Sequence, residues 1–494
     1  MYVSNIVIGA GLGGISTAIT LAARGQQVLV LEKNDRPGGK MDEVLSDGYR
    51  FDTGPSLLTM KFVLDSLFQL AGKQTDSFLE IHPIDPICRY FYPDGIRLDA
   101  HADIRKMQRN LPEKLRVDQD ALRQFFEYSK KIYDLTADLF LFDSIRNPAH
   151  IFNPQAWKVL FQLRSIDAFR TVHQANQSYF KSPHLVQLFD RYATYNGSNP
   201  FQAPATLNII PHVEYTLGSW YIKGGMYRLT EALIILAESL GVRFQYQTPV
   251  SEILVENKRV KGIKTMAGDS IASDNVISNS DVVHTYTQLL KPPYQQLKWE
   301  KKEPSCSGLV FLWGIKKSYS QLSHHNILFS ENYQQEFQEI FQNRKAPTDP
   351  TVYISITAKQ DPTHAPDGCE NWFVLVNMPW INEQETNTNE EVNAIRQAVF
   401  RKLISCGIES PEAFIETEKI LTPAYLRHRT WTNKGSIYGL SSNHRNAAFN
   451  RQDVRCRSIK GLYFAGGSAH PGGGIPLVLL SGMLAAKAVL KDLT

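Results

Sequence analysis

The residues with the clearest chemical meaning lie near the start of the chain, where glycines recur at a fixed spacing. Gly9, Gly11 and Gly14 form the pattern Gly-x-Gly-x-x-Gly directly after an apolar stretch that begins at Val3. In this pattern Gly9 permits a tight turn, Gly11 lets the backbone approach a pyrophosphate, and Gly14 lets a helix pack closely on a strand. The phosphates would then lie at a helix N-terminus, where free N–H groups and the helix dipole favour anions.

An acidic residue at the end of the next apolar stretch extends this pattern. Glu32 lies 21 residues after Gly11. A carboxylate at this place accepts hydrogen bonds from ribose hydroxyls and would repel a 2′-phosphate. A glycine-rich turn without a ligand leaves Glu32 unexplained, so the pattern predicts a dinucleotide site. The expected contacts are Gly9, Ala10, Gly11, Leu12, Gly13, Gly14, Glu32 and Lys33.

Two segments after Glu32 carry further residues suited to a bound dinucleotide. Residues 36–40 read Arg-Pro-Gly-Gly-Lys, and residues 51–56 read Phe-Asp-Thr-Gly-Pro-Ser. Glycines here would let the backbone lie against phosphates or a ribityl chain, and Lys40 would add a cation beside them. The alternative is a loop that only turns the chain. The expected contacts are Gly39, Lys40, Gly54, Pro55, Ser56 and, further along the chain, Val250.

A third glycine cluster lies near the C-terminus, at residues 461–474. Six of the 31 glycines of the chain fall within it. Pro476 follows the cluster, and proline is favoured in the first turn of a helix, because its missing N–H costs little there. The start of that helix would hold negative charge. The expected ligand contacts are Gly467, Ser468, Gly474 and Ile475, and the alternative is a glycine turn without a ligand.

Strands and helices that the hydrophobic pattern predicts must position these motifs. A strand from Val3, a helix over residues 15–24 ended by Gly25, and a strand over residues 27–32 form a βαβ unit. Residues 61–210 are predicted to be mostly helical. Further helices are expected at 226–240, 390–405 and 476–490, and further strands within 242–265 and at 273–278, 308–315, 351–356 and 372–377.

This order predicts an α/β protein of two discontinuous domains. Segments typical of a nucleotide-binding α/β domain occur at both ends of the chain and once in the middle. Residues 1–65, 215–286 and 455–494 are therefore expected to form one domain. Residues 66–214 and 287–454 are expected to form a substrate-binding domain.

The composition argues against several classes of protein. The 53 Lys and Arg residues against 49 Asp and Glu residues give a net charge of +4. This slight basic balance does not predict nucleic-acid binding, which normally needs a concentrated basic face. The five cysteines include no Cys-x-x-Cys pair, so neither a disulfide scaffold nor a metal site is predicted. No run of about 18 apolar residues occurs. The chain is therefore expected to be cytoplasmic, with membrane contact only at the surface of the bilayer.

Taken together, these segments resemble the phytoene-desaturase type of bacterial and fungal carotenoid desaturases, within the flavin amine-oxidase-like superfamily. The resemblance covers essentially the whole chain. It includes Gly-Ala-Gly-Leu-Gly-Gly at 9–14, Asn-Pro-Phe at 199–201, Leu-Gly-Ser-Trp-Tyr-Ile-Lys-Gly-Gly-Met at 217–226 and Gly-Ser-Ala-His-Pro-Gly at 467–472. The last segment favours carotenoid and retinoid desaturases over amine oxidases.

The resemblance implies a fold and a reaction. The implied fold is a Rossmann-type FAD-binding domain, as in p-hydroxybenzoate hydroxylase and amine oxidases, with a discontinuous α+β substrate domain and a helical membrane-associating region. The implied reaction uses noncovalent FAD to remove two hydrogens from adjacent carbons of a long carotenoid, one as a hydride to the flavin and one as a proton. Oxygen or a quinone would then accept the electrons.

The segments at 40–43 and 56–60 are most similar to hydroxycarotenoid 3,4-desaturases. Phytoene desaturation stays open as an alternative, as does a flavin-dependent carotenoid or retinoid isomerase or saturase. An amine or porphyrinogen oxidase and a non-enzymatic lipid-binding escort are more remote alternatives. The escort is disfavoured because both glycine clusters for the flavin are intact.

No general base stands out, and three residues are candidates for a catalytic role. His470 lies among the C-terminal glycines, although a hydrogen-bonded turn histidine would look the same. Arg170 lies in a segment that resembles one with an arginine in related desaturases, with a solvated helix charge as the equal alternative. Asp190 next to Arg191 is better explained as a structural ion pair.

The aromatic segment 120–170 is predicted to be helical and bears on the substrate. Its apolar faces would line a polyene tunnel or lie in the membrane interface, and ordinary domain core is the alternative. The apolar residues are Leu122, Phe125, Phe126, Ile132, Leu139, Phe140, Phe142, Phe152, Trp157 and Phe161, with Lys158, Arg164 and Arg170 between them.

Overall fold

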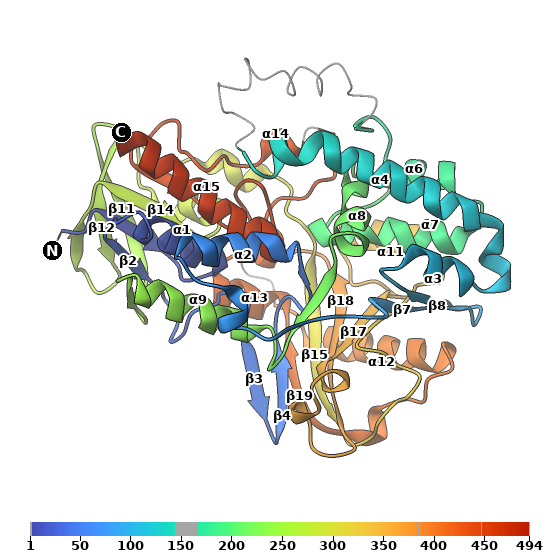
Figure 1. Cartoon of the computed structure of the whole chain (residues 1–494). Helices are drawn as coiled ribbons and strands as arrows, with labels where there is room; N and C mark the ends of the chain where they lie inside the picture. The colour runs from blue at the N-terminus through green and yellow to red at the C-terminus, as the bar shows by residue number, and fades with distance from the viewer. Residues whose placement is uncertain (1, 144–165, 383–385, 446, 494) are drawn as a thin grey trace.

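The computed structural model shows two halves of the molecule, each built around its own sheet (Figure 1). The structure describes residues 2–143, 166–382, 386–445 and 447–493. Both chain ends lie in the same half, on the left of Figure 1. That half therefore combines the beginning and the end of the sequence.

In the described part of the chain, five parallel strands form the sheet of this half, in the order β10-β2-β1-β14-β20. These strands are β1 (Asn5–Ile8), β2 (Val28–Leu31), β10 (Arg243–Gln245), β14 (Asn275–Ser278) and β20 (Leu462–Phe464). Strands β1, β2, β14 and β20 are buried along their whole length, as expected for a parallel sheet covered on both faces. Three distant segments of the chain thus build one sheet.

One face of this sheet is covered by helices that share a single hydrophobic core. They are α1 (Leu12–Ala22), α2 (Lys61–Leu70), α9 (Tyr227–Ser239) and α15 (Ile475–Leu493). Helices α1 and α15 lie side by side in Figure 1. A Cβ atom on Gly482 would lie 2.3 Å from the carbonyl oxygen of Gly13, so glycine is required where these helices cross. The other face packs against β11 (Val250–Glu256), β12 (Arg259–Thr265) and β13 (Ser270–Ala272).

The second half contains a seven-stranded mixed sheet among the described residues, in the order β19-β15-β18-β17-β16-β7-β8. Its strands are β7 (Cys88–Phe91), β8 (Arg97–Ala100), β15 (Ser307–Ile315), β16 (His325–Leu328), β17 (Val352–Ile356), β18 (Glu370–Met378) and β19 (Ile415–Leu421). One face packs on α12 (Asn389–Ser405), where Trp313 and Phe400 are in ring contact. The opposite face borders the cavity described below.

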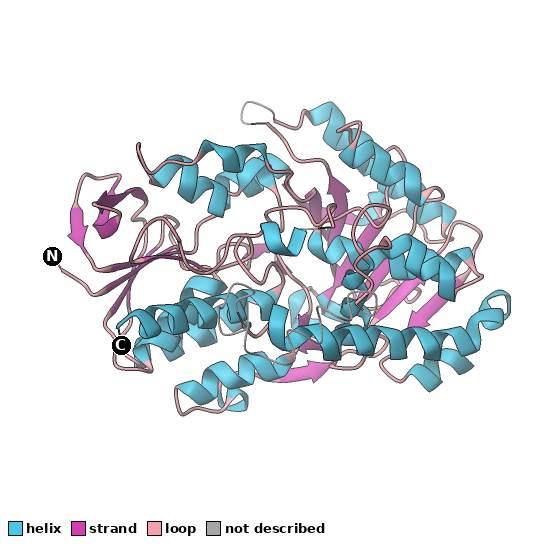
Figure 2. Ribbon diagram, turned by 90° about the horizontal axis from the view of Figure 1, so that it is seen from above, coloured by secondary structure: helices cyan, strands magenta, loops and turns pink. Residues whose placement is uncertain are grey.

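A layer of helices lies beyond that opposite face, as the view from above shows (Figure 2). It comprises α3 (Ile104–Arg109), α4 (Gln119–Phe140), α6 (Val172–Tyr179), α7 (Pro183–Asp190), α8 (Ile209–Tyr215) and α11 (Tyr333–Phe341). Aromatic rings hold these helices together, with Phe125 of α4 lying 4.3 Å from Phe189 of α7 between ring centroids. The remaining strands and α-helices among the described residues are β3 (Glu43–Ser46), β4 (Tyr49–Asp52), β5 (Leu58–Thr59), β6 (Ile81–Pro83), β9 (Ser219–Ile222), α10 (Val282–His284), α13 (Pro423–Thr430) and α14 (Ala447–Asn450).

Two expectations from the sequence differ from this fold. The mostly helical prediction for residues 61–210 was wrong for β6, β7 and β8. Strands β6 and β7 pair with the distant strands β9 and β16, and β8 pairs with β7. The first helix begins at Leu12 instead of residue 15, so Gly13 and Gly14 lie within it. The proposed domain boundaries stay a prediction.

A buried carboxyl in α11 makes stability depend on pH. Glu336 accepts hydrogen bonds from Ser330 Oγ at 2.7 Å and from the backbone N–H of Thr351 at 3.0 Å, and burial raises its pKa to about 7. The folded protein therefore keeps a proton that the unfolded chain releases near pH 4.3. A raised folded-state pKa means that this residue lowers stability as pH rises through that window.

We therefore expect Glu336→Gln to gain stability relative to the wild type on going from pH 5 to pH 8, by about 2–3 kcal/mol. Glutamine keeps an acceptor for Thr351 and does not titrate. Urea unfolding of both proteins at the two pH values measures the change. A stability difference that is the same at both pH values would contradict it.

Candidate functional site

A cavity of about 740 Å³ joins the two halves of the molecule. One end is lined by the glycine turn after β1, with Gly9 and Gly11, and by Glu32. The other end lies over the seven-stranded sheet, with Val310, Leu375 and other residues of that face. A single cavity therefore connects the predicted nucleotide site with an apolar chamber.

The glycine turn builds a narrow backbone cradle at the start of α1. Gly9 has a φ of 97°, which favours glycine, whereas Gly11 caps α1 in an extended conformation. A Cβ on Gly14 would lie 2.1 Å from the carbonyl oxygen of Gly9, so the helix approaches the strand as closely as the backbone allows. The first-turn N–H groups have no intrahelical partner and suit an anion. Ala10, Gly13 and Gly14 stand behind the cavity wall, whereas Gly9, Gly11 and Leu12 line it.

Glu32 lies buried at the end of β2, where its two oxygens have backbone partners. Oε2 accepts the N–H of Ala10 at 2.8 Å, and Oε1 accepts the N–H of Asn34 at 2.9 Å. These bonds hold the carboxylate beside the glycine turn, as the ribose contact requires. Lys33 follows, with its ammonium over the Trp431 ring, and burial lowers its pKa.

The middle of the cavity is lined by the two loops after β2. Gly39, Lys40, Gly54, Pro55 and Ser56 all face it. A Cβ on Gly54 would lie 2.0 Å from the carbonyl oxygen of Lys40, so the loops are in close contact. The ammonium of Lys40 donates to the carbonyl oxygens of Ser436 and Ile437, and burial lowers its pKa to about 8.

The C-terminal glycine cluster meets the N-terminal one across the cavity. A Cβ on Gly13 would lie 2.8 Å from the backbone nitrogen of Gly466, and the amide of Asn279 donates to Ala465 beside it. Ser468 accepts a hydrogen bond from the N–H of Val282 at 3.0 Å. The cavity is lined here by Gly467, Ser468 and Val250. It is also lined by Gly474 and Ile475, which lie at the start of α15.

Arg451 is a cavity residue that sequence reasoning missed. Its guanidinium donates to the carbonyl oxygen of Gly467 at 2.7 Å and to that of Tyr438 at 3.3 Å. Burial lowers its pKa to about 10. No motif surrounds this arginine in the sequence, and its partners are brought to it only by the fold.

These residues fit a dinucleotide. A helix N-terminus with exposed backbone N–H groups, glycines whose Cβ atoms would clash, and a fixed carboxylate at the ribose position all lie on one cavity wall. This is the arrangement that binds the pyrophosphate and ribose of NAD or FAD.

The three catalytic candidates have different surroundings. His470 lines the cavity, but its Nε2 lies 2.9 Å from the carbonyl oxygen of Asp143 and burial lowers its pKa. Arg170 makes an ion pair with Asp167 at 2.6 Å and is not among the cavity-lining residues. Asp190 also lies outside the cavity lining, and its carboxylate accepts hydrogen bonds from Asn176 and lies 2.6 Å from His173.

The expected ion pair of Asp190 with Arg191 was wrong. Arg191 turns instead into the cavity region, where its Nη2 lies 3.4 Å from Glu214 Oε1 and donates to Tyr90 Oη at 2.7 Å. Tyr192 Oη donates to Glu214 at 2.7 Å, and Tyr195 Oη donates to the second carboxylate oxygen. We call Arg191, Glu214, Tyr90, Tyr192 and Tyr195 the arginine cluster.

The chamber over the seven-stranded sheet is mostly apolar. Alternate residues of each strand share one face of a sheet, and this face presents Ile327, Val310, Phe373 and Leu375 to the cavity. The facing helical layer adds apolar side chains from several segments. They are Phe140, Leu141, Ile166, Ala168, Leu207, Ile209, Ile210 and Val213.

The aromatic segment 120–170 divides between core and cavity. Leu122, Phe125, Phe126 and Ile132 are buried, which matches the alternative of ordinary domain core. Phe140 lines the cavity. Leu139 packs against Ile166, and Phe142 contacts Phe62. Residues Phe152, Trp157, Lys158, Phe161 and Arg164 lie outside the described residues.

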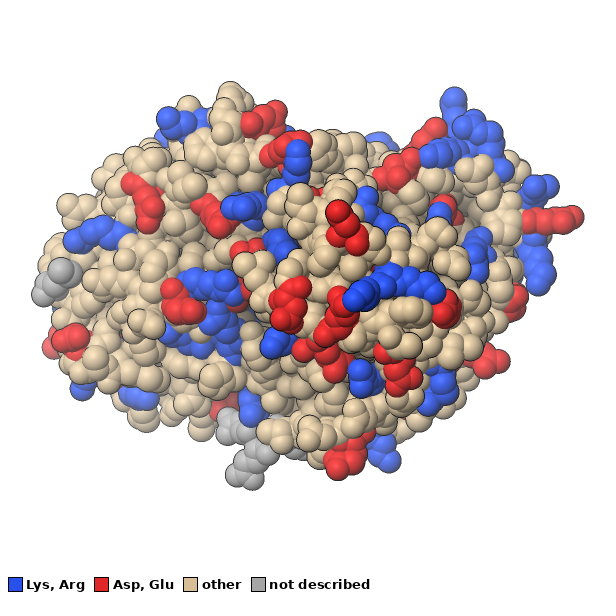
Figure 3. All heavy atoms as spheres, turned by 90° about the horizontal axis from the view of Figure 1, so that it is seen from below, with Lys and Arg blue, Asp and Glu red and all other residues tan. Residues whose placement is uncertain are grey.

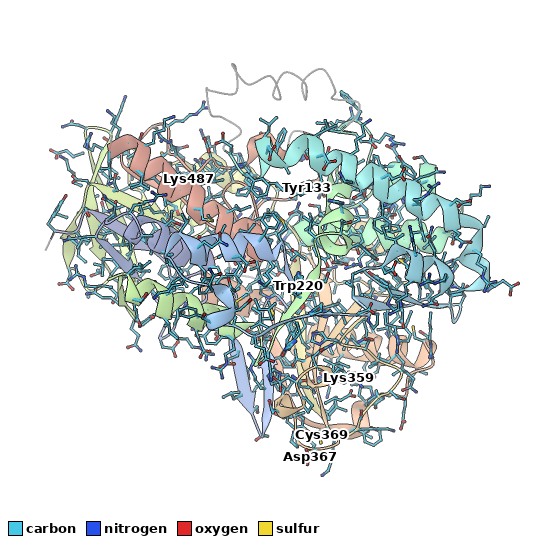
Figure 4. The ribbon with its side chains drawn as sticks, viewed as in Figure 1. Tyr133, Trp220, Lys359, Asp367, Cys369 and Lys487 are labelled. Carbon is cyan, nitrogen blue, oxygen red and sulfur yellow. The ribbon has the colours of Figure 1, made fainter. Side chains whose placement is uncertain are left out.

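The surface carries charges of both signs. On the face seen from below, Lys and Arg side chains alternate with Asp and Glu (Figure 3). In Figure 4, Trp220 lies near the middle of the molecule, whereas Lys359, Asp367 and Cys369 lie at its lower end, outside the cavity lining. Among the described residues, no helix combines the length and hydropathy that a bilayer-spanning segment needs.

Comparison with known proteins shows the family to which the chain belongs. The family model described as flavin containing amine oxidoreductase matches residues 12–490. A 1-hydroxycarotenoid 3,4-desaturase of Flavobacterium sp. (strain P99-3) is 41% identical over 484 residues, covering 98% of each chain. A 4,4′-diapolycopene oxygenase of Methylomonas sp. is 37% identical over 493 residues, covering 99% of this chain and 98% of the relative.

A solved structure confirms the fold class. Cyclohexylamine oxidase from Brevibacterium oxydans IH-35A superposes with a TM-score of 0.64 at 17% identity, covering both chains in full. At this identity the likeness shows the fold alone, which is the mixed α/β fold of flavin amine oxidases. The protein is therefore an oxidoreductase that belongs to the flavin containing amine oxidoreductase family, within its group of carotenoid desaturases and oxygenases.

Proposed function

We propose that the protein is an FAD-dependent 1-hydroxycarotenoid 3,4-desaturase. The observation that carries the proposal is the single cavity that joins a dinucleotide cradle to an apolar chamber. A relative with this activity, aligned over 98% of each chain, supports the choice of reaction.

FAD would lie along the first wall of the cavity. Its adenosine ribose would meet Glu32, its pyrophosphate the N-terminus of α1, and its ring system the loop of Gly54, Pro55 and Ser56 together with the start of α15. The binding is noncovalent in this proposal. When bound, the flavin supplies the acceptor for a hydride from the substrate.

The residues of the second wall position the polyene and exclude water. The apolar face of the seven-stranded sheet and the helices opposite it match a rod of conjugated carbons. The chain supplies little charge stabilisation of its own there, because a cation on a polyene is delocalised over the conjugated carbons. Oxygen or a quinone would accept the electrons in the end.

A decisive test is expression in cells that make carotenoids, with 1-hydroxylated and unhydroxylated precursors supplied separately. The proposal expects one further double bond in the hydroxylated precursor, seen as a red shift of the absorbance spectrum. Conversion of the unhydroxylated precursor alone would overturn it in favour of phytoene-type desaturation. A product that has gained oxygen instead of a double bond would indicate an oxygenase, the activity in the name of the Methylomonas relative.

Glu32 tests the cofactor assignment. Replacing it with alanine removes the ribose acceptor and the partner of the Ala10 N–H. We expect the affinity for FAD to fall by about 10- to 100-fold, since hydrogen bonds to charged groups contribute about 1.5–3 kcal/mol each. Titration of the flavin-free protein with FAD, followed by flavin fluorescence, measures the dissociation constant. Unchanged affinity would remove Glu32 from the binding site.

We also propose that the protein is cytoplasmic and peripherally bound to the membrane that holds its substrate. A carotenoid dissolves in the bilayer, so an enzyme at its surface avoids moving the polyene through water. We expect the protein to float with lipid vesicles in a density gradient without added salt. Protein that stays entirely at the bottom of the gradient would contradict this.

A further inference from the structure

Two cations of the cavity wall, Lys40 and Arg451, are held by one short segment of the chain, residues 436–440. The ammonium of Lys40 donates hydrogen bonds to two carbonyl oxygens of this segment, and the guanidinium of Arg451 donates to two others. In order along the segment, the four acceptors are Ser436, Ile437, Tyr438 and Leu440. The two cations are more than 400 residues apart in the chain, so only the fold makes them neighbours.

Segment 436–440 packs against the loop that leads into α15. A Cβ atom on Gly439 would lie 2.8 Å from the Cα atom of Ser468, and one on Gly473 would lie 2.7 Å from Cδ1 of Tyr438. The segment therefore stands directly behind the C-terminal glycine cluster. The two cations that it holds line the cavity beside this cluster and the start of α15.

This part of the wall is where the flavin ring is expected, because the ribose and the pyrophosphate belong at the end of β2 and at the N-terminus of α1. The loop of Lys40 begins at the glycine turn, where a Cβ on Gly39 would lie 3.4 Å from the Cα of Gly11. The Lys40 side chain then crosses to Ile437, whose Cδ1 would lie 3.1 Å from a Cβ on Gly308 of β15. The ammonium thus lies where the cradle meets the apolar chamber.

The protein does not balance the charges of these two cations. Within the described residues, their hydrogen-bond partners are all backbone carbonyl oxygens, which carry no net charge. Asp281 is the carboxyl group that attracts both cations, and it is buried with its Oδ1 accepting the N–H of Val283 at 2.8 Å. It contributes at most one negative charge. Burial lowers the pKa of Lys40 to about 8 and that of Arg451 to about 10, so both stay protonated at pH 7.

An unbalanced positive charge in the protein interior is costly, and the cost falls when an anion binds beside it. The oxidised flavin ring is neutral, whereas the ring reduced by two electrons carries a negative charge when its N1 is deprotonated. Charge near the ring is one of the means by which a protein tunes a cofactor. Cations beside the ring favour its reduced form, and the positive end of the α15 dipole acts in the same direction.

We infer that Lys40 and Arg451 form an electropositive site that stabilises the anionic reduced flavin and thereby raises the reduction potential of the bound cofactor. The inference rests on the proposed function, because that function places FAD in this cavity. Neither residue has to touch the ring, since a Coulomb interaction extends beyond contact distance in the protein interior. A C–H bond of a hydrocarbon is a weak hydride donor, so a raised flavin potential favours the transfer.

The test measures the two-electron midpoint potential of bound FAD at pH 7, by anaerobic reduction of the flavin-loaded protein together with a reference dye. Lys40→Met removes one charge at a similar side-chain length, and Arg451→Gln removes the other but keeps an amide donor. Arg451→Lys keeps the charge. Lys33→Met is the matched control, because Lys33 also lines the cavity but lies beside Glu32 at the adenosine end. Circular dichroism verifies the folding of each variant.

We expect Lys40→Met and Arg451→Gln each to shift the equilibrium toward oxidised flavin by about tenfold, which lowers the potential of a two-electron couple by about 30 mV. Arg451→Lys and Lys33→Met should change the equilibrium by less than about threefold, or about 14 mV. Titrations of the flavin-free proteins with oxidised and with reduced FAD provide a second measurement. The affinity lost in the two charge-removing variants should be mainly that for reduced FAD.

Unchanged potentials in Lys40→Met and Arg451→Gln, or an equal shift in Lys33→Met, would overturn the inference. Equal loss of affinity for oxidised and reduced FAD would assign the two cations to the pyrophosphate, whose charge is the same in both redox states, and would overturn it too. If Arg451→Gln does not fold, the comparison of Lys40→Met with Lys33→Met decides the outcome.

The same proteins separate this inference from the proposed function. If the potentials shift as expected but no polyene is converted, the proposed reaction fails and the electropositive site stands. If polyenes are converted and the potentials do not shift, the reaction stands and the electropositive site fails.

Discussion

A Gly11→Val variant is expected to purify without flavin, with its affinity for FAD lowered at least about 100-fold. Gly11 caps α1 with an extended backbone, which valine adopts without strain, so the fold should be retained. The added Cβ would lie 2.7 Å from Asn279 Oδ1, and its methyl groups would fill the cavity beside the helix N-terminus. The methyl groups of the introduced valine would therefore occupy the place where the pyrophosphate must approach the backbone.

The flavin content of this variant is measured from the ratio of absorbance at the flavin band to that of the protein, with circular dichroism to verify folding. Gly25→Asn is the matched control at the other end of the same helix. Gly25 has a φ of 76°, which asparagine tolerates, and its Cβ would point into open space. The control should stay yellow. A Gly11→Val protein with a full complement of flavin would show that the cradle does not hold the pyrophosphate.

The second large effect is expected on stability, from Glu214→Leu. Glu214 is buried and accepts hydrogen bonds from Tyr192 and Tyr195 beside Arg191. Leucine would leave a buried guanidinium without its counter-charge, and breaking a buried ion pair from one side typically costs about 3–5 kcal/mol. We expect the free energy of unfolding to fall by that amount.

Denaturant unfolding monitored by circular dichroism measures this loss. Glu214→Gln keeps one acceptor oxygen and should lose less. Glu409→Ala breaks an exposed pair with Lys317 and should change stability by less than about 1 kcal/mol, because solvent screens such a pair. A Glu214→Leu protein as stable as the Glu409→Ala protein would mean that Arg191 finds another partner.

The geometry of the glycine turn and of Glu32 was predictable because its determinants are local. The turn at Gly9, the packing at Gly14 and the position of Glu32 all follow from a strand, a glycine turn, a helix and a second strand within the first 32 residues. Backbone geometry allows few residue types at these places. The same reasoning reached Gly474 at the start of α15, since glycine and proline are typical of such a helix start.

The sheet under the chamber was predictable only in part: the strands expected at 308–315, 351–356 and 372–377 are β15, β17 and β18, but β7 was missed. Strand β7 spans four residues and lies between β8, the next strand in the chain, and β16, which lies more than 200 residues later. A short strand carries too little periodicity to be distinguished from loop or helix. The position of β7 in the sheet therefore depends on β16, a partner that the local sequence does not identify.

Arg191 illustrates the limit most clearly. Its neighbour Asp190 suggested an ion pair, yet consecutive residues in a helical turn point about 100° apart. Asp190 thus faces His173 and Asn176, while Arg191 faces Glu214. The sequence showed that an acidic and a basic residue are neighbours and suggested that they pair. The packing of α7 and α8 determined instead that Arg191 pairs with Glu214.

The amino-acid sequence by itself determined the dinucleotide motif and the family, because these depend on residue types at short, backbone-limited spacings. Only the tertiary structure decided which polar groups meet in the apolar chamber. A side chain's burial and its partners are set by segments that are distant along the chain, and no local pattern encodes that proximity.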